Sequence, residues 1–90
     1  MEWYMCGVDD PTEDSVAVWL VYESTTPAGV SRGIRTALCL WKKERFNPIK
    51  VMPNQPMTRI RGRKICWAYV TEVPRLPMLE DDGKGWRVVE

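Results

Sequence analysis

The chain has 90 residues, of which 44% are apolar and 28% charged, and its formal net charge is +1. This size and composition are typical of one globular domain, so we assign residues 1–90 to a single domain and exclude a disordered chain. The sequence contains no histidine, which excludes Ser-His and Cys-His catalytic pairs and histidine metal ligands.

The first third of the chain predicts strands separated by turns. Residues 1–5 are a candidate edge strand, and residues 9–14 are a turn or a single helical turn capped by Asp10. Residues 15–23 read SVAVWLVYE, and this run of β-branched and aromatic side chains is typical of a buried strand. Residues 24–29 contain a proline and a glycine at positions that suit a β-turn.

Residues 30–46 fit two structures. Apolar residues recur at helical spacing from Val30 to Trp41, but residues 33–42 also fit a strand with two apolar faces. Gly33 and Thr36 have low helix propensity, so we predict a strand over residues 33–42. The alternative is a basic amphipathic helix within residues 30–46.

The second half of the chain predicts a loop, a hairpin and a last strand. Residues 47–56 contain three prolines and therefore form an ordered loop or a short edge strand rather than a helix. Residues 57–71 predict a hairpin that turns near Arg61-Gly62. With a two-residue loop Ile60 would face Arg63, and Arg59 would face Lys64. The alternative is a longer loop with Gly62 at a bulge, because arginine is unfavourable at the first central position of the usual hairpin turns. Residues 86–89 predict a short strand within a flexible tail over residues 78–90.

Together these elements predict a mostly β domain. We expect a compact antiparallel sheet of four or five short strands, with at most one helix, in residues 30–46. A small α+β fold is the alternative if that helix forms.

The charges are segregated along the chain. Residues 1–31 carry six acidic and no basic residues, residues 32–64 carry ten basic residues and one acidic residue, and residues 65–90 have a net charge of −2. Such asymmetry indicates either internal pairing between the acidic and basic segments or a surface for a charged partner.

Two basic groups are the candidate binding residues. Four cations lie within six residues around Gly62, and a second group lies beside Trp41 and Phe46. Guanidinium groups bind carboxylates or phosphates bidentately, and neighbouring aromatic rings can stack on bases. The predicted binding residues are Arg59, Arg61, Arg63, Lys64, Lys42, Lys43, Arg45 and Trp41.

The tryptophan content is high, with five in the chain. Trp19 and Trp67 lie within strand patterns, which predicts that both belong to the core. Trp3, Trp41 and Trp86 lie nearer segment ends, where a core role and a binding role fit equally, because tryptophan is enriched at binding hot spots.

The three cysteines, Cys6, Cys39 and Cys66, are isolated from one another in the sequence. They form neither a four-ligand zinc motif nor a disulfide framework. The sequence shows neither a signal-peptide pattern nor an apolar run long enough to span a membrane. We therefore expect a cytoplasmic protein without membrane contact, metal or cofactor. The absence of a phosphate-binding loop or a dinucleotide-binding turn predicts that the protein is not an enzyme.

Several short elements carry a family resemblance. They are the start at Glu2-Trp3, the acidic turn before the valine-rich strand of residues 16–22, and the stretch from Ile65 to Val70 followed by Pro74-Arg75-Leu76-Pro77. Over residues 2–77 the chain resembles small tryptophan-rich phage and prophage proteins of unknown function. That family usually has histidine before its closing tryptophan, where this chain has Cys66. The resemblance implies a small β-rich phage protein that acts on host machinery in the bacterial cytoplasm.

The function predicted from these observations is binding rather than catalysis. We expect a phage-encoded inhibitor or modulator that blocks an acidic host protein through its basic, aromatic-flanked surface. The alternative is a small nucleic-acid-binding protein that uses the same basic segment. The sequence leaves the oligomeric state open, a homodimer included.

Overall fold

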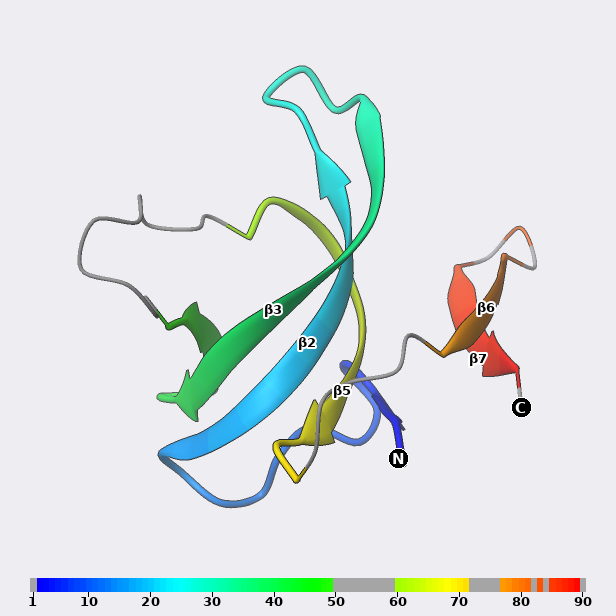
Figure 1. The fold of residues 1–90 in the computed structure, drawn as a ribbon. Helices are drawn as coiled ribbons and strands as arrows, with labels where there is room; N and C mark the ends of the chain where they lie inside the picture. The colour runs from blue at the N-terminus through cyan, green and yellow to red at the C-terminus, as the bar shows by residue number, and fades with distance from the viewer. Residues whose placement is uncertain (1, 50–59, 72–76, 82, 84, 90) are drawn as a thin grey trace.

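The computed structural model describes residues 2–49, 60–71, 77–81, 83 and 85–89. The described residues form strands and no helix, which confirms the predicted mostly β fold (Figure 1). The strands are β1 (Tyr4–Met5), β2 (Val16–Thr25), β3 (Ser31–Lys42), β4 (Arg45–Pro48), β5 (Gly62–Tyr69), β6 (Met78–Asp81) and β7 (Trp86–Val89). Nothing in this part of the chain is a helix of the length and apolarity needed to cross a membrane.

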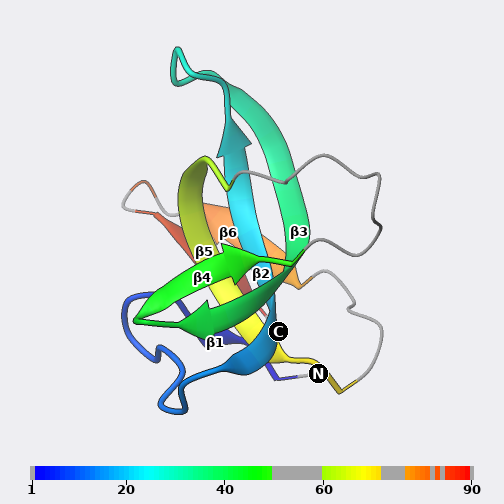
Figure 2. The same cartoon turned by 90° about the vertical axis from the view of Figure 1, so that its left-hand side faces the viewer.

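Five strands form one antiparallel sheet in the order β1-β5-β2-β3-β4. The sheet curls strongly, and the outer part of the β2–β3 hairpin projects beyond the rest of it (Figures 1 and 2). Strands β6 and β7 form a separate two-stranded sheet. The strand predicted over residues 33–42 is therefore correct, and the helix considered for residues 30–46 does not form.

The central strand β2 has buried side chains on both of its faces, which agrees with its nearly continuous apolar sequence. Val18 and Leu20 point into the larger core cluster, while Val21 belongs to a smaller cluster on the opposite face. All three side chains are inaccessible to solvent. Burial on two faces fixes the register of β2, since a shift by one residue would exchange the two sets of side chains.

The larger core is built around aromatic side chains. Trp67 is only 2% exposed, its indole Nε1 donates a hydrogen bond of 2.8 Å to the carbonyl oxygen of Asp9, and its ring stacks on Tyr4 at 4.8 Å between centroids. Trp41 is 8% exposed and packs edge-on against Phe46 at 4.6 Å. The predicted core role of Trp67 is thus confirmed, and Trp41 also belongs to the core. The same prediction is wrong for Trp19, which is half-buried and belongs to neither core cluster of the described residues.

The smaller core lies on the other face of the sheet. It contains Val21, Ile65 and Cys66, and the β6–β7 hairpin packs against it. The register between β2 and β5 shifts after Val21, so two successive residues of β5 fall on the same face. The C-terminal hairpin thereby covers apolar surface that the main sheet would otherwise expose.

The predicted hairpin over residues 57–71 is wrong in its described part. Gly62 does not form a turn but begins β5, which pairs with β2, so that Arg63 lies opposite Glu23 rather than Ile60. A Cβ atom on Gly62 would lie 1.9 Å from the carbonyl oxygen of Glu23, and the φ angle is +123°. The glycine is therefore required for close strand approach, a need that resembles a turn signal in the sequence. Residues 57–59 lie outside the described residues.

Candidate interaction surface

The structure places the two predicted basic groups on different elements. Lys42, Lys43 and Arg45 surround the β3–β4 turn, and all three are exposed. Arg61, Arg63 and Lys64 lie at the start of β5, and they are exposed as well. Arg59 lies outside the described residues. The two groups have different electrostatic surroundings, which decide what each of them can bind.

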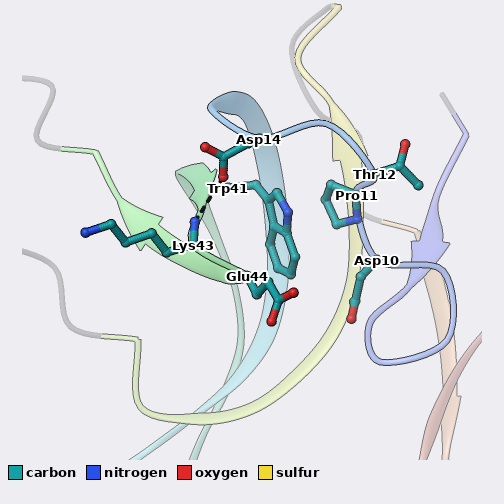
Figure 3. Close-up of a pocket in the computed structure, with 7 residues that line it drawn as sticks. All are labelled: Asp10, Pro11, Thr12, Asp14, Trp41, Lys43 and Glu44. Atoms are coloured by element: carbon teal, nitrogen blue, oxygen red, sulfur yellow. Dashed lines mark hydrogen bonds between the residues drawn. The ribbon is translucent and has the colours of Figure 1, made fainter.

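The β3–β4 turn is held by the acidic N-terminal loop. Lys43 and Glu44 both have left-handed φ angles, 53° and 59°, although neither is a glycine. The backbone N–H of Lys43 donates a hydrogen bond of 3.0 Å to Oδ1 of Asp14 (Figure 3). Ser15, which follows Asp14, also has a left-handed φ angle. Its backbone N–H donates a hydrogen bond of 2.7 Å to the carbonyl oxygen of Trp41.

Acidic and basic side chains are mixed at this turn. A hollow between the N-terminal loop and the turn has Trp41 at its centre and three carboxylates around it, while the Lys43 side chain points away (Figure 3). The residues lining it are Asp10, Pro11, Thr12, Asp14, Trp41, Lys43 and Glu44. A neighbouring hollow of about 290 Å³ brings Arg45 and Lys64 beside Asp10 and Glu44. The hairpin half of the basic segment therefore lies in a mixed electrostatic field.

The other end of the sheet gathers cations across three strands. In one cross-strand row, Arg35 of β3 and Lys64 of β5 flank Tyr22 of β2. In the next row, Glu23 lies between Ile34 and Arg63. Two rows further on, the backbone N–H of Thr25 donates to the carbonyl oxygen of Arg61 at 3.0 Å.

We call this group the cationic cluster. Its members are Arg32, Arg35, Arg61, Arg63 and Lys64, all exposed. Adjacent strands lie about 4.8 Å apart and successive residues rise about 3.3 Å, so the backbone positions of the cluster fit within roughly 10 Å by 10 Å. The register thus brings cations from two separate stretches of the sequence together at this end of the sheet, with Arg35 and Lys64 on one face and Arg63 on the other.

Carboxylates approach two members of the cationic cluster without forming ion pairs. Lys64 shares a hollow with Asp10 and Glu44, and Glu23 lies opposite Arg63. The Oε2 atom of Glu23 accepts a hydrogen bond of 3.2 Å from the hydroxyl of Ser31. Among the described residues, one ion pair has a nitrogen–oxygen distance below 4.0 Å. It joins Arg87 to Glu80 of the β6–β7 hairpin at 2.9 Å. None of the described carboxylates neutralises the cluster at ion-pair distance.

The sequence alone did not identify Arg32 and Arg35 as members of the site. In the alternative helix over residues 30–46 both arginines would lie on the polar side, together with Lys42 and Lys43. The signal that would have found them is the cross-strand register, which sets Arg35 level with Lys64 although 28 positions of the sequence separate them. The aromatic ring within the cluster, that of Tyr22, is 4% exposed and belongs to the core.

The thiols offer no nucleophile at neutral pH. Cys39 and Cys66 are inaccessible to solvent, and burial raises the pKa of each thiol to about 12. Burial also raises the pKa of Cys6 to about 12. The positive charge of Lys64 lowers the pKa values of Cys6 and Cys39, but this effect is smaller than that of burial. No group of three or more cysteine or acidic side chains among the described residues is arranged to hold a metal ion.

Comparison with known proteins identifies no relative of this chain. Searches against protein-family models, curated proteins and solved structures find no match. The function must therefore be argued from the cationic cluster and its surroundings.

Proposed function

We propose that this protein is a non-enzymatic binding protein that docks on the acidic surface of a partner protein through the cationic cluster. The observation that carries the proposal is the cross-strand register, which concentrates five exposed cations without a described carboxylate at ion-pair distance. Like charges held this close repel one another, and an anionic partner relieves that repulsion. Four of the five cations are arginines, which form bidentate contacts with carboxylates.

Two observations favour a protein partner over nucleic acid. The pI of the chain is about 7.7, whereas nucleic-acid-binding domains commonly exceed 9. The aromatic rings near the basic residues, those of Tyr22, Trp41 and Phe46, are buried and cannot stack on bases. The cluster therefore offers charge and hydrogen bonds without a stacking platform.

The biological setting of this proposal comes from the sequence resemblance to small phage proteins. A phage protein of this kind would act in the bacterial cytoplasm, and its simplest mechanism is to block a host protein by covering an acidic surface. This role as an inhibitor or modulator requires no catalytic group in the chain.

The test compares two matched charge reversals. Arg61→Glu combined with Arg63→Glu changes the cluster, whereas Lys42→Glu combined with Lys43→Glu makes the same charge change at the β3–β4 turn. Each protein is immobilised, and partners retained from a bacterial lysate are identified by mass spectrometry and then purified for affinity measurement. We expect the cluster variant to lose at least tenfold in affinity for the retained protein and the turn variant to lose less.

A parallel titration addresses nucleic acid. Binding of a 20-base-pair DNA duplex is measured at 50 and 200 mM salt. Duplex binding that falls with a log–log salt slope near −4, as expected for about five phosphate contacts, would replace the proposed function by nucleic-acid binding. Equal affinity of both charge-reversal variants for the retained protein would remove the cationic cluster from the interface.

A further inference from the structure

Among the described residues, the start of β5 has no strand partner on the side away from β2, and we call this side the open edge of β5. Strand β1 pairs with β5 only at Trp67 and Cys66, and the backbone N–H of Cys6 then donates to the carbonyl oxygen of Ile65 at 3.0 Å. Beyond that point the chain of β1 turns away, since Asp9 donates its N–H back to the carbonyl oxygen of Met5. In Figure 2 the upper part of β5 forms the margin of the sheet. None of the described residues pairs with residues 62–64 on that side.

The orientation of the backbone groups follows from the register. The carbonyl oxygen of Arg61 points toward β2, because it accepts from Thr25. Backbone groups alternate in direction along a strand, so those of Arg63 also face β2. The N–H and C=O groups of Gly62 and Lys64 consequently face outward. An added strand would find two donors and two acceptors there.

The side chains at this edge carry positive charge on both faces of the sheet. Lys64 shares a face with Tyr22 and Arg35, and Arg63 shares the opposite face with Glu23. An extended segment that paired with this edge would place its successive side chains alternately beside Lys64 and beside Arg63. Acidic residues at consecutive positions of that segment would then meet a cation on each face.

We propose that the acidic partner binds by strand addition: an extended acidic segment of the partner protein pairs with the open edge of β5 at residues 62–64. This inference rests on the proposed function and specifies its mode. Backbone hydrogen bonds to Gly62 and Lys64 supply affinity, and the cationic cluster supplies specificity for acidic side chains.

The same charges disfavour a second copy of this chain as the occupant. Two copies paired edge to edge would bring their cations together, and like charges opposite each other destabilise a strand pair. Basic residues on edge strands commonly prevent such self-association. The side chains of an acidic segment are instead attracted by these cations. The charge of the open edge therefore favours the acidic segment over a second copy of the chain.

The test uses a defined probe and amide hydrogen exchange. The probe is a blocked eight-residue peptide of threonine and glutamate with three consecutive glutamates at its centre. In the free chain we expect the amides of Gly62 and Lys64 to exchange faster than that of Arg63. Saturation with the peptide should slow exchange at Gly62 and Lys64 at least tenfold. Absence of peptide binding at millimolar concentration, or binding without this protection, would overturn strand addition.

Two controls separate backbone pairing from charge. The same peptide N-methylated at its central glutamates keeps its charge but lacks the pairing groups, and we expect at least tenfold weaker binding. In the chain, Lys64→Gln removes only the charge, whereas Lys64→Pro also removes the outward N–H and should bind the peptide more weakly than Lys64→Gln. The N-methylated peptide keeps the test valid even if the proline variant unfolds.

The outcomes also separate this inference from the function on which it rests. Equal binding of the methylated and unmethylated peptides, together with loss of binding in the Arg61→Glu, Arg63→Glu variant, would refute strand addition and leave the acidic-partner proposal standing. Protection of Gly62 and Lys64 in the absence of peptide, in a chain that sediments as a dimer, would assign the edge to a second copy. Protection by duplex DNA would refute both proposals.

Discussion

At the scale of single residues, Gly62 has a structural role that no other residue can fill. Its φ angle is +123°, and a Cβ atom would lie 1.9 Å from the carbonyl oxygen of Glu23. We expect Gly62→Ala to lower the free energy of unfolding by roughly 3 kcal/mol, because both the backbone conformation and the strand spacing must change. Urea unfolding followed by tryptophan fluorescence measures this loss.

The control for this prediction is Gly29→Ala. Gly29 also has a positive φ, +84°, but a Cβ atom there would meet nothing within 4 Å. Gly29→Ala should lower the free energy of unfolding by about 1 kcal/mol, which is the conformational cost alone. Equal losses for the two variants would mean that close approach to Glu23 does not constrain β5.

The buried thiols give a second prediction at this scale. Burial raises the pKa values of Cys6, Cys39 and Cys66 to about 12, above the value of 9.0 for a free thiol. At pH 8 we therefore expect the folded chain to resist alkylation by iodoacetamide, and the urea-unfolded chain to react fully. Rapid alkylation of Cys39 or Cys66 in the folded chain at pH 8 would show that these thiols are accessible.

The sign of the pH effect on stability follows from the same shift. Because the thiol pKa is higher in the folded chain than in the unfolded chain, the thiols favour folding fully below pH 9, and this contribution is lost as the pH rises toward 12.

At the scale of elements, the β3–β4 turn depends on a contact with the N-terminal loop. Two left-handed non-glycine residues make this turn intrinsically unfavourable, and Asp14 fixes it by accepting from the Lys43 N–H. We expect Asp14→Ala to cost about 1 kcal/mol in the free energy of unfolding. Asp14→Asn, which retains an acceptor, should cost less than half as much.

The matched control for the Asp14 variants is Glu13→Ala, an exposed neighbour in the same loop. It should leave the urea midpoint nearly unchanged, as surface substitutions without special contacts usually do. A midpoint for Asp14→Ala equal to that of Glu13→Ala would show that the turn does not need this hydrogen bond.

The C-terminal hairpin is the second element whose packing can be tested. Trp86 packs against the smaller core, whereas Met78 on the paired strand β6 is 74% exposed. Trp86→Ala should lower the free energy of unfolding by roughly 2 kcal/mol through lost apolar contacts, and Met78→Ala by less than about 0.5 kcal/mol. If both variants melt like the parent chain, the hairpin does not contribute to the stability of the sheet.

Elements with a strong local pattern could be predicted from the sequence. The apolar run of β2 and the two-faced apolar pattern of β3 define strands regardless of what packs on them. The start of β5 could not be predicted, because the close approach that requires Gly62 arises from a strand some 40 positions away. The candidate site could also be predicted only in part. Local clusters of cations are visible in the sequence, but Arg35 and Lys64 become neighbours only because both pair with Tyr22 of β2.

At the scale of the whole molecule, folding separates charge. The β2–β3 hairpin and the start of β5 carry the cationic cluster, whereas Asp10 and Asp14 lie beside the β3–β4 turn. The near-neutral net charge therefore conceals a cationic end of the sheet and a turn region in which acidic and basic side chains are mixed. A molecule of this kind orients in the field of a charged partner before contact, which raises the association rate and makes it dependent on salt.

The central claim is that no carboxylate of the described residues lies within ion-pair distance of the cationic cluster. The melting temperature of the Arg61→Glu, Arg63→Glu variant at low salt tests this claim most directly. The account predicts that the melting temperature stays within about 2 °C of that of the parent chain. Reversal breaks no ion pair among the described residues, and the repulsion that it relieves around Lys64 offsets the repulsion that it introduces opposite Glu23. Loss of internal ion pairs worth 1 kcal/mol would lower it by about 4–8 °C in a domain of this size, and such a fall would contradict the account.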